Sequence, residues 1–191
     1  LDEVLKAANF DMGFATVEYV SSALVDLAFH EGEAPADPMA KQADVLNGLG
    51  MPHAIRMRHA TPHFAHVFAG DGYSSGYYSY MWSEVMDADA FAAFEEAGDA
   101  FHPGQAAALE EHILSTGGSK DAEALYKAFR GRLPGVDALL KGRGLVACSG
   151  TAGNIPKRFG GYAKLGIDSD NKSFYFCIAA KILRCRKTEG T

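Results

Sequence analysis

The residues with the clearest chemical potential lie between His63 and Glu84, where four tyrosines and two histidines surround three glycines. Glycine allows tight turns and a close approach of the backbone to a ligand. A tyrosine hydroxyl is a neutral hydrogen-bond donor near pH 7. A loop that presents such hydroxyls in a cleft suits the binding of peptide carbonyls and of a developing oxyanion. This segment therefore predicts a binding site for peptide-like molecules.

The tyrosines follow a helical spacing. On a helix that starts near residue 73, Tyr73, Tyr77 and Tyr80 are spaced i, i+4 and i+7, so they share one face. Tyr78 and Met81 would lie on another face, as core residues. The alternative is that all the tyrosines pack in an amphipathic core with satisfied hydroxyls.

Three histidines nearby have a ligand-like spacing. His59, His63 and His66 are separated by four and then three residues, which would place them on one helical face. Pro62 lies inside this run and disfavours a continuous helix. A metal-dependent hydrolase built on these histidines is one hypothesis, and a role in lining a channel or in structure is its alternative.

The elements that must position these residues are helices. Apolar periodicity, proline and glycine signals predict an all-α body up to Leu145. The expected helices cover residues 10–30 and 39–49, a longer helix that begins near 73–77 and runs towards Phe94, residues 103–117, a helix capped by Ser119, and residues 136–141.

The amino-acid composition and the charge of the chain change near residue 145. Residues 1–145 carry a net charge of −11, whereas residues 146–191 carry +5 and contain all three cysteines. The cysteine-free remainder favours a reducing compartment. Residues 173–178 are the only good strand candidate. We therefore expect two parts: a helical region over 1–145, and an irregular or β-prone basic tail of unknown role over 146–191.

Several segments carry a resemblance to the zinc oligopeptidases, the family of peptidyl-dipeptidase, oligopeptidase A and thimet oligopeptidase. The region from about Phe10 to Leu145 is similar to the C-terminal catalytic part of that family. The segments that carry the resemblance are GFATVEY from Gly13, MRHATPHFAH from Met57, GYSSGYYSYMWSEV from Gly72 and AFRGRLP from Ala128.

The resemblance implies a mainly helical enzyme with a deep channel that admits short peptides. It also implies a zinc ion on an HExxH helix, whose glutamate acts as general base on the bound water. No HExxH occurs in this sequence, because His30-Glu31 is followed by Gly32, Glu33 and Ala34. We therefore expect the zinc ligands to lie outside this chain and the isolated chain to be inactive.

The resemblance also implies roles for individual residues. Tyr80 is expected to donate a hydrogen bond to the tetrahedral intermediate, with Tyr73 and His66 as further catalytic contacts near the same carbonyl. The expected substrate-binding residues are Tyr77, Gly72 and Gly76. No metal ligand is expected among residues 1–191.

The leading hypothesis is a fragment of a cytoplasmic zinc metallopeptidase that hydrolyses short peptides. The first residue is Leu1, and Leu1–Lys6 already has helical character, so we expect the chain to begin inside a longer protein. The alternative is a non-catalytic helical peptide-binding module. No apolar run approaches the ~18 residues that span a bilayer. We expect no membrane or nucleic-acid partner, and a monomer at full length.

Overall fold

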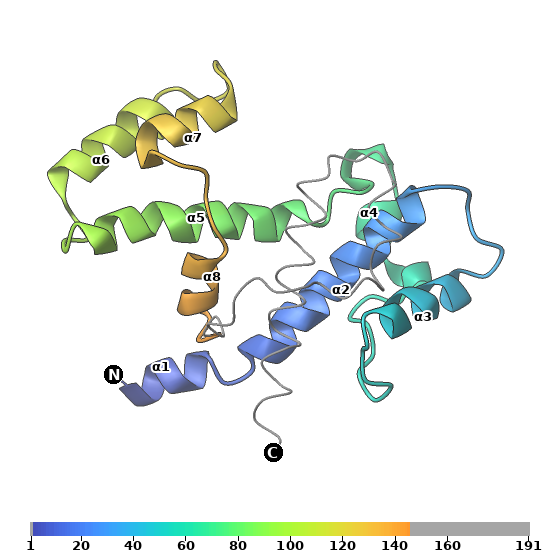
Figure 1. The fold of residues 1–191 in the computed structure, drawn as a ribbon. Coiled ribbons are helices and arrows are strands. Elements are labelled where there is room, and N and C mark those ends of the chain that lie inside the picture. The colour runs from blue at the N-terminus through green and yellow to red at the C-terminus, as the bar shows by residue number, and fades with distance from the viewer. Residues whose placement is uncertain (1, 146–191) are drawn as a thin grey trace, which may run out of the picture. The chain divides into compact units, whose positions relative to one another are not determined.

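In the computed structural model, residues 2–145 are described, and within them every regular element is helical (Figure 1). The prediction of an all-α body is therefore confirmed for this range. The α-helices are α1 (Asp2–Ala8), α2 (Met12–His30), α3 (Pro38–Gly48), α4 (Ala65–Phe68), α5 (Ser79–Glu96), α6 (Pro103–Leu109), α7 (Ala122–Arg130) and α8 (Asp137–Gly142).

The expected basic tail, 146–191, and its strand candidate, 173–178, lie outside the described residues. The division at residue 145 therefore stays a prediction. Within the described range the chain forms two compact units, one of residues 2–80 with Leu145 and one of residues 81–144. Each unit has its own core.

Most helix boundaries follow local sequence signals. Pro38 occupies the first turn of α3. The Asp37 side chain caps this helix by accepting hydrogen bonds from the Met39 and Ala40 N–H groups, at 2.9 and 3.0 Å. Pro103 likewise opens α6. Gly131 ends α7 with a left-handed φ of 79°.

Three boundary predictions are wrong. Ser119 does not cap α7, because the Asp121 carboxylate accepts the hydrogen bond from the Ala124 N–H at 2.8 Å. The helix expected from 103 to 117 is α6 followed by a π-helical segment, Glu110–Leu114. The helix expected to start between Tyr73 and Tyr77 begins only at Ser79, for a reason found in the site described below.

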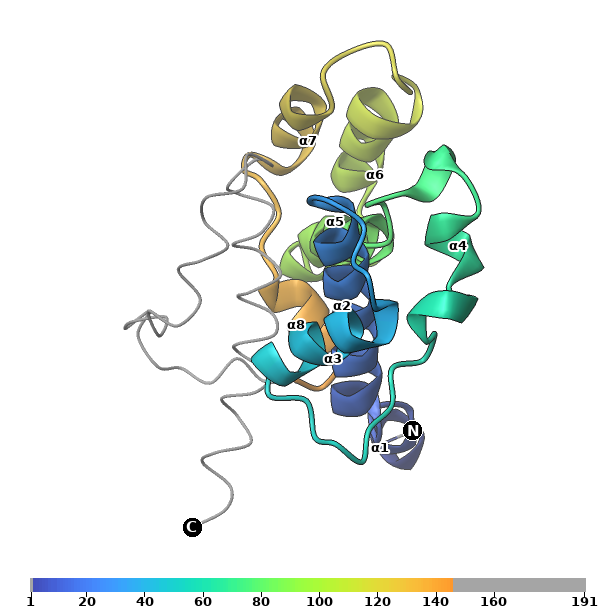
Figure 2. The ribbon, with the colours of Figure 1, turned by 90° about the vertical axis from the view of Figure 1, so that its right-hand side faces the viewer.

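The first unit places α3 against α2 (Figure 2). Its core includes Val25 of α2, Val45 of α3, and Phe64 and Val67 around α4. The buried Gln42 side chain of α3 accepts hydrogen bonds from the Thr61 N–H at 2.8 Å and from its hydroxyl at 2.9 Å. This contact fixes the 3-10 turn Thr61–His63 that leads into α4.

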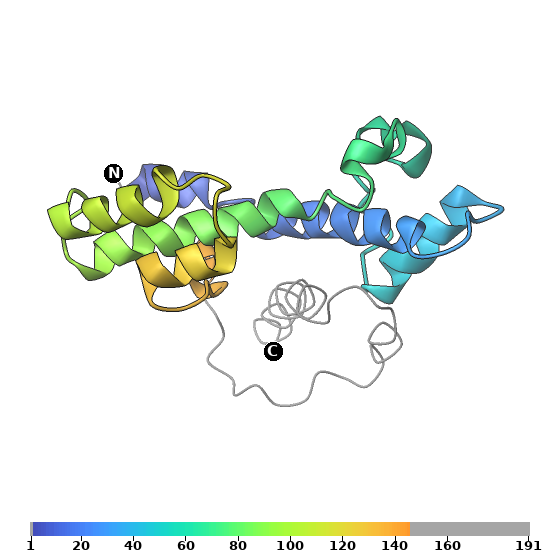
Figure 3. The ribbon, with the colours of Figure 1, turned by 90° about the horizontal axis from the view of Figure 1, so that it is seen from above.

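The second unit packs α6 and α7 along α5 (Figure 3), with Phe94 of α5 and Phe129 of α7 in a shared core. Its polar centre is Asp89 of α5, which is 2% exposed. The Asp89 carboxylate faces Arg130 Nε at 3.2 Å and accepts hydrogen bonds from Arg132 at 2.6 Å and from the Tyr126 hydroxyl at 2.9 Å. Burial and the neighbouring Asp89 raise the pKa of Tyr126.

Arg130 also forms a bidentate salt bridge with the Glu96 carboxylate, with N–O distances of 2.8 and 2.6 Å. This hydrogen bonding lowers the pKa of the Glu96 carboxyl below its ordinary value of 4.5. A lowered pKa in the folded state adds stability above the ordinary pKa, and that stability is lost as the pH falls through the folded-state value.

Replacement Glu96→Gln is therefore expected to lower the free energy of unfolding at pH 7 and to have no effect once Glu96 is protonated in the parent. Denaturant unfolding of both proteins at pH 7 and at a series of lower pH values measures this. A difference in the free energy of unfolding that does not shrink as the pH falls would contradict the assignment, because other acidic groups titrate equally in both proteins.

By length and composition, one described stretch, Asp2–His30, is apolar enough to cross a membrane, with a mean hydropathy of 1.2 over an 18-residue window. However, 44% of that window is buried within the structure. A core helix of a soluble protein passes the same test, so this is a weak indication. The expectation that no apolar run approaches a span is corrected to this extent.

Candidate active site

The three residues expected to act on a carbonyl come from three separate segments of the first unit. His66 lies on α4, Tyr73 ends the 3-10 turn Asp71–Tyr73, and Tyr80 lies in the first turn of α5. The structure brings them together around the His66 ring. The Tyr80 hydroxyl lies 3.1 Å from His66 Nε2, and Tyr73 stacks on the imidazole at a centroid distance of 4.7 Å.

These groups are open to solvent. Tyr73 is 59% exposed and Tyr80 is 47% exposed, and His66 is also exposed. Either group can be the donor in this contact, and when the imidazole Nε2–H donates to the phenol oxygen, the phenol O–H remains available to a third oxygen atom. The cluster can therefore hydrogen-bond a carbonyl or an oxyanion that approaches from solution.

Tyr77 adds a half-buried side to the cluster. Its ring lies 5.7 Å from His66 and 5.8 Å from Tyr80, centroid to centroid, and it stacks on Tyr19 at 5.1 Å. The Tyr19 hydroxyl donates a hydrogen bond to the Tyr77 carbonyl oxygen. Burial raises the pKa of the Tyr77 phenol, so this hydroxyl stays a neutral donor at physiological pH.

The prediction that Tyr73, Tyr77 and Tyr80 share a face of one continuous helix is wrong. Ser75 has a left-handed φ of 58°, and α5 begins only at Ser79. The Ser75 and Tyr77 N–H groups donate to the Asp26 carboxylate and therefore do not form helical hydrogen bonds to backbone carbonyls. The tyrosines meet around His66 because the chain turns back, not because of helical spacing.

The two predicted glycines differ in what the fold demands of them. A Cβ atom on Gly76 would lie 3.1 Å from the Tyr73 carbonyl oxygen, which already accepts the Gly76 N–H at 3.0 Å. Gly76 therefore permits the tight turn between Tyr73 and α5. A Cβ on Gly72 would meet nothing within 4 Å, so its binding role stays a prediction without steric support.

The carboxylate that organises this turn belongs to Asp26, which sequence reasoning missed. Asp26 lies on α2, is 0% exposed, and accepts hydrogen bonds from Ser75 N–H at 3.1 Å and Tyr77 N–H at 2.9 Å. His30 Nδ1 lies 2.9 Å from the same carboxylate. An acidic residue in the middle of an apolar stretch, Ala23–Phe29, was the available signal.

The structure does not gather the three spaced histidines into a metal site. His59 stacks on Phe64 at 5.1 Å, whereas His66 stacks on Tyr73. Among residues 2–145, no group of three or more His, Cys, Asp or Glu side chains is arranged to hold a metal ion. The described residues therefore do not fit a zinc centre, and the hypothesis of a hydrolase built on these histidines loses its support.

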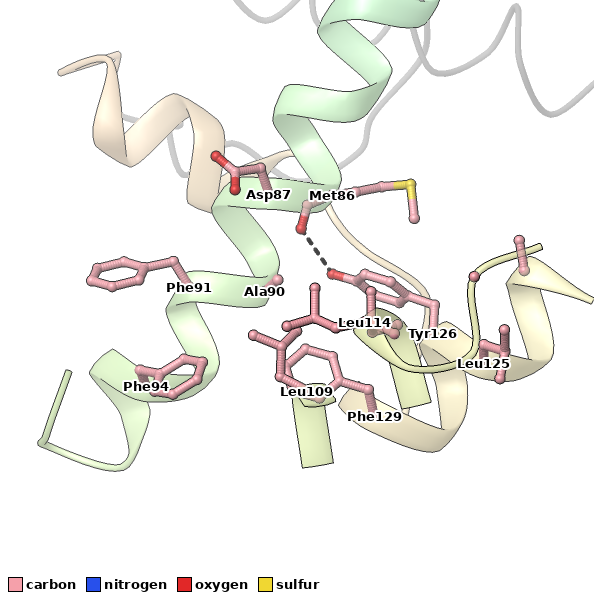
Figure 4. Close-up of a pocket in the computed structure, with 13 residues that line it drawn as sticks. Met86, Asp87, Ala90, Phe91, Phe94, Leu109, Leu114, Leu125, Tyr126 and Phe129 are labelled. Carbon is pink, nitrogen blue, oxygen red and sulfur yellow. Dashed lines mark hydrogen bonds between the residues drawn. The ribbon is translucent and has the colours of Figure 1, made fainter. Parts of the chain in front are cut away.

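The second unit contains an apolar pocket of about 460 Å³ that none of the predicted site residues lines. Figure 4 shows Phe94 of α5 facing Leu109, Leu114 and Phe129 across it, whereas the Phe91 ring points away from them. The Tyr126 hydroxyl, whose proton is shared with the Asp89 carboxylate, also lies 3.1 Å from the Met86 carbonyl oxygen. Asp87 is the only acidic side chain in the lining, so the pocket lacks paired groups for acid–base chemistry.

Comparison with known proteins places the chain in a family. The model of peptidase family M3 matches residues 1–145. The chain belongs to peptidase family M3. It is 36% identical to oligopeptidase A of Escherichia coli over 151 residues and 35% identical to that of Haemophilus influenzae over 149 residues, in each case over 76% of this chain. It is also 36% identical to the dipeptidyl carboxypeptidase of E. coli over 144 residues, 73% of this chain.

The M3 relatives are much longer than the matched region. The chain spans about a fifth of their length, 22% of each oligopeptidase A and 21% of the dipeptidyl carboxypeptidase. The expected resemblance is confirmed at the level of the family. The roles of the single residues and the identity of the metal remain predictions.

Proposed function

We propose that residues 1–145 supply the substrate side of an M3 peptidase active site that hydrolyses short peptides. The observation that carries the proposal is the convergence on His66, where residues from α4, the following turn and α5 meet at an exposed cluster. The Tyr80 hydroxyl, Tyr73 and His66 would donate hydrogen bonds to the oxyanion formed at the scissile carbonyl. Tyr77 would contact the substrate backbone, with Gly72 and Gly76 beside it.

The metal of the whole protein would be zinc, held by an HExxH segment outside residues 2–145. Zinc would polarise the carbonyl and activate the attacking water. The described residues hold no such centre, so their proposed work is to bind the peptide, orient it and donate hydrogen bonds. We further propose that the whole protein is a cytoplasmic monomer, and that the chain is a fragment of it that is inactive alone.

A second candidate is a non-catalytic peptide-binding module, which is favoured by the lack of a metal-holding group among residues 2–145. The two candidates differ in one outcome. Joined to an HExxH-bearing part of an M3 peptidase, the region would restore peptide hydrolysis if it is catalytic. A folded, metal-loaded product without hydrolysis would favour the module.

If the cluster around His66 binds an oxyanion, the full chain should prefer a peptide that carries an anionic tetrahedral group, even without metal. A short phosphinic peptide, whose phosphoryl oxygens mimic the tetrahedral intermediate, is expected to bind about 10- to 150-fold more tightly than its methylene analogue, because hydrogen bonds to a charged group contribute ~1.5–3 kcal/mol. Titration calorimetry of both peptides measures this preference.

The Tyr80→Phe variant should lose most of this preference, whereas Tyr78→Phe should keep it. Tyr78 is a matched control, because the change removes the same hydroxyl two residues away. Equal affinity of the unchanged chain for the two peptides would contradict the proposal.

A further inference from the structure

One buried carboxylate of α2 holds two backbone N–H groups of the loop Ser75–Tyr77, in addition to the hydrogen bond from the Tyr19 hydroxyl to the Tyr77 carbonyl oxygen. Asp26 accepts hydrogen bonds from two N–H groups that lie 49 and 51 residues later in the chain, those of Ser75 and Tyr77. The two donors bind different oxygens, Oδ1 and Oδ2, at 3.1 and 2.9 Å. Both oxygens of the carboxylate are therefore used to hold the loop backbone.

A fully buried carboxylate is costly unless polar partners compensate it. Burial raises the pKa of Asp26, and the two N–H groups with His30 act in the opposite direction. His30 Nδ1 lies 2.9 Å from Oδ1, and the His30 ring is stacked on Phe68 at 5.3 Å. These polar contacts offset the free-energy cost of burying the Asp26 carboxylate.

The backbone of the loop Ser75–Tyr77 is held by hydrogen bonds to a residue outside the loop. Ser75 has a φ of 58°, a conformation that residues other than glycine seldom adopt. The N–H groups on both sides of Gly76 point away from the chain's own helical carbonyls and toward Asp26. Tyr77, held in this way, packs between Tyr19, Phe64 and His66.

We propose that Asp26 is a positioning residue, which holds the Ser75–Tyr77 backbone so that Tyr77 and Tyr73 meet His66 in the geometry that binds the peptide. The expected effect on peptide binding rests on the proposed function, whereas the anchoring of the loop by Asp26 does not. Asp26 touches no substrate and acts through the loop.

The anchoring is tested by amide hydrogen exchange in the full chain, followed by NMR. In Asp26→Ala, the Ser75 and Tyr77 amides are expected to exchange about 10- to 150-fold faster, the range set by hydrogen bonds to a charged group. In Asp26→Asn, the remaining carbonyl oxygen can accept only one of the two N–H groups, so one amide should stay protected. Unchanged exchange of both amides in Asp26→Asn would overturn the inference, even if Asp26→Ala failed to fold.

The consequence for binding is tested with the phosphinic peptide. Asp26→Ala should weaken its binding at least about tenfold, and Asp26→Asn should recover part of the loss. Val20→Ala is the control, because it truncates another buried side chain on α2 that forms no hydrogen bond to the loop. Equal weakening in Val20→Ala would show a general loss of structure and overturn the positioning role.

The two proposals fail in different ways. If the unchanged chain does not bind the phosphinic peptide but Asp26→Asn releases a loop amide, the proposed function fails and the anchoring stands. If the unchanged chain binds the peptide and the Asp26 variants bind it equally well, the positioning role fails alone.

Discussion

Replacing Tyr80 with phenylalanine is expected to lower kcat by about 100- to 1000-fold and to change KM little, because the loss of one oxyanion donor acts mainly in the transition state. This corresponds to ~2.7–4 kcal/mol of transition-state stabilisation. The structure supports the role in two ways. Tyr80 is exposed, and its hydroxyl lies 3.1 Å from His66, so the phenol can turn from the imidazole to the substrate.

The measurement needs this region together with a metal site. One suitable protein is E. coli oligopeptidase A in which residues 1–145 replace the aligned segment. The unsubstituted chimera must hydrolyse a short fluorogenic peptide before the variants are compared. Tyr78→Phe is the matched control and should keep the kcat of the parent chimera. Equal kcat values for Tyr80→Phe and the parent would remove Tyr80 from the mechanism.

Replacing Asp89 with alanine is expected to destabilise the chain by about 3–5 kcal/mol, the usual cost of breaking a buried ion pair by removing one partner. Asp89 is 2% exposed and faces Arg130, Arg132 and Tyr126, which come from α7 and the segment after it. Its removal leaves the buried Arg130 guanidinium with Glu96 as its remaining acidic partner, and that partner is exposed.

Urea unfolding followed by circular dichroism measures this loss. Asp87→Ala is the control, because Asp87 lies on the same helix but is exposed, and its replacement should change stability by less than about 0.5 kcal/mol. Similar effects of the two substitutions would show that Asp89 is not a structural centre of the second unit.

Asp26 and Asp89 illustrate one principle in two units. Each is a buried aspartate on a long helix, and each binds a segment about 40 or more residues later in the chain. In the first unit the partners are backbone N–H groups, so the aspartate shapes a loop. In the second unit the partners are side chains, so the aspartate joins α5 to α7.

Local sequence determined most of the helical body. Apolar periodicity, together with Pro38 and Pro103, predicts several helices close to their observed bounds because these signals act within one or two turns. The motif around Tyr73–Tyr80 also led to the correct family, since residue types and spacing are themselves sequence properties.

Tertiary structure decided where the site residues lie. Helical spacing predicted that Tyr73, Tyr77 and Tyr80 share a face, yet they meet only because the chain turns at Ser75 and Gly76. That turn depends on hydrogen bonds to Asp26, about 50 residues earlier in the sequence. No local pattern reports a contact of this kind, because its energy comes from two segments that are brought together only when the first unit folds.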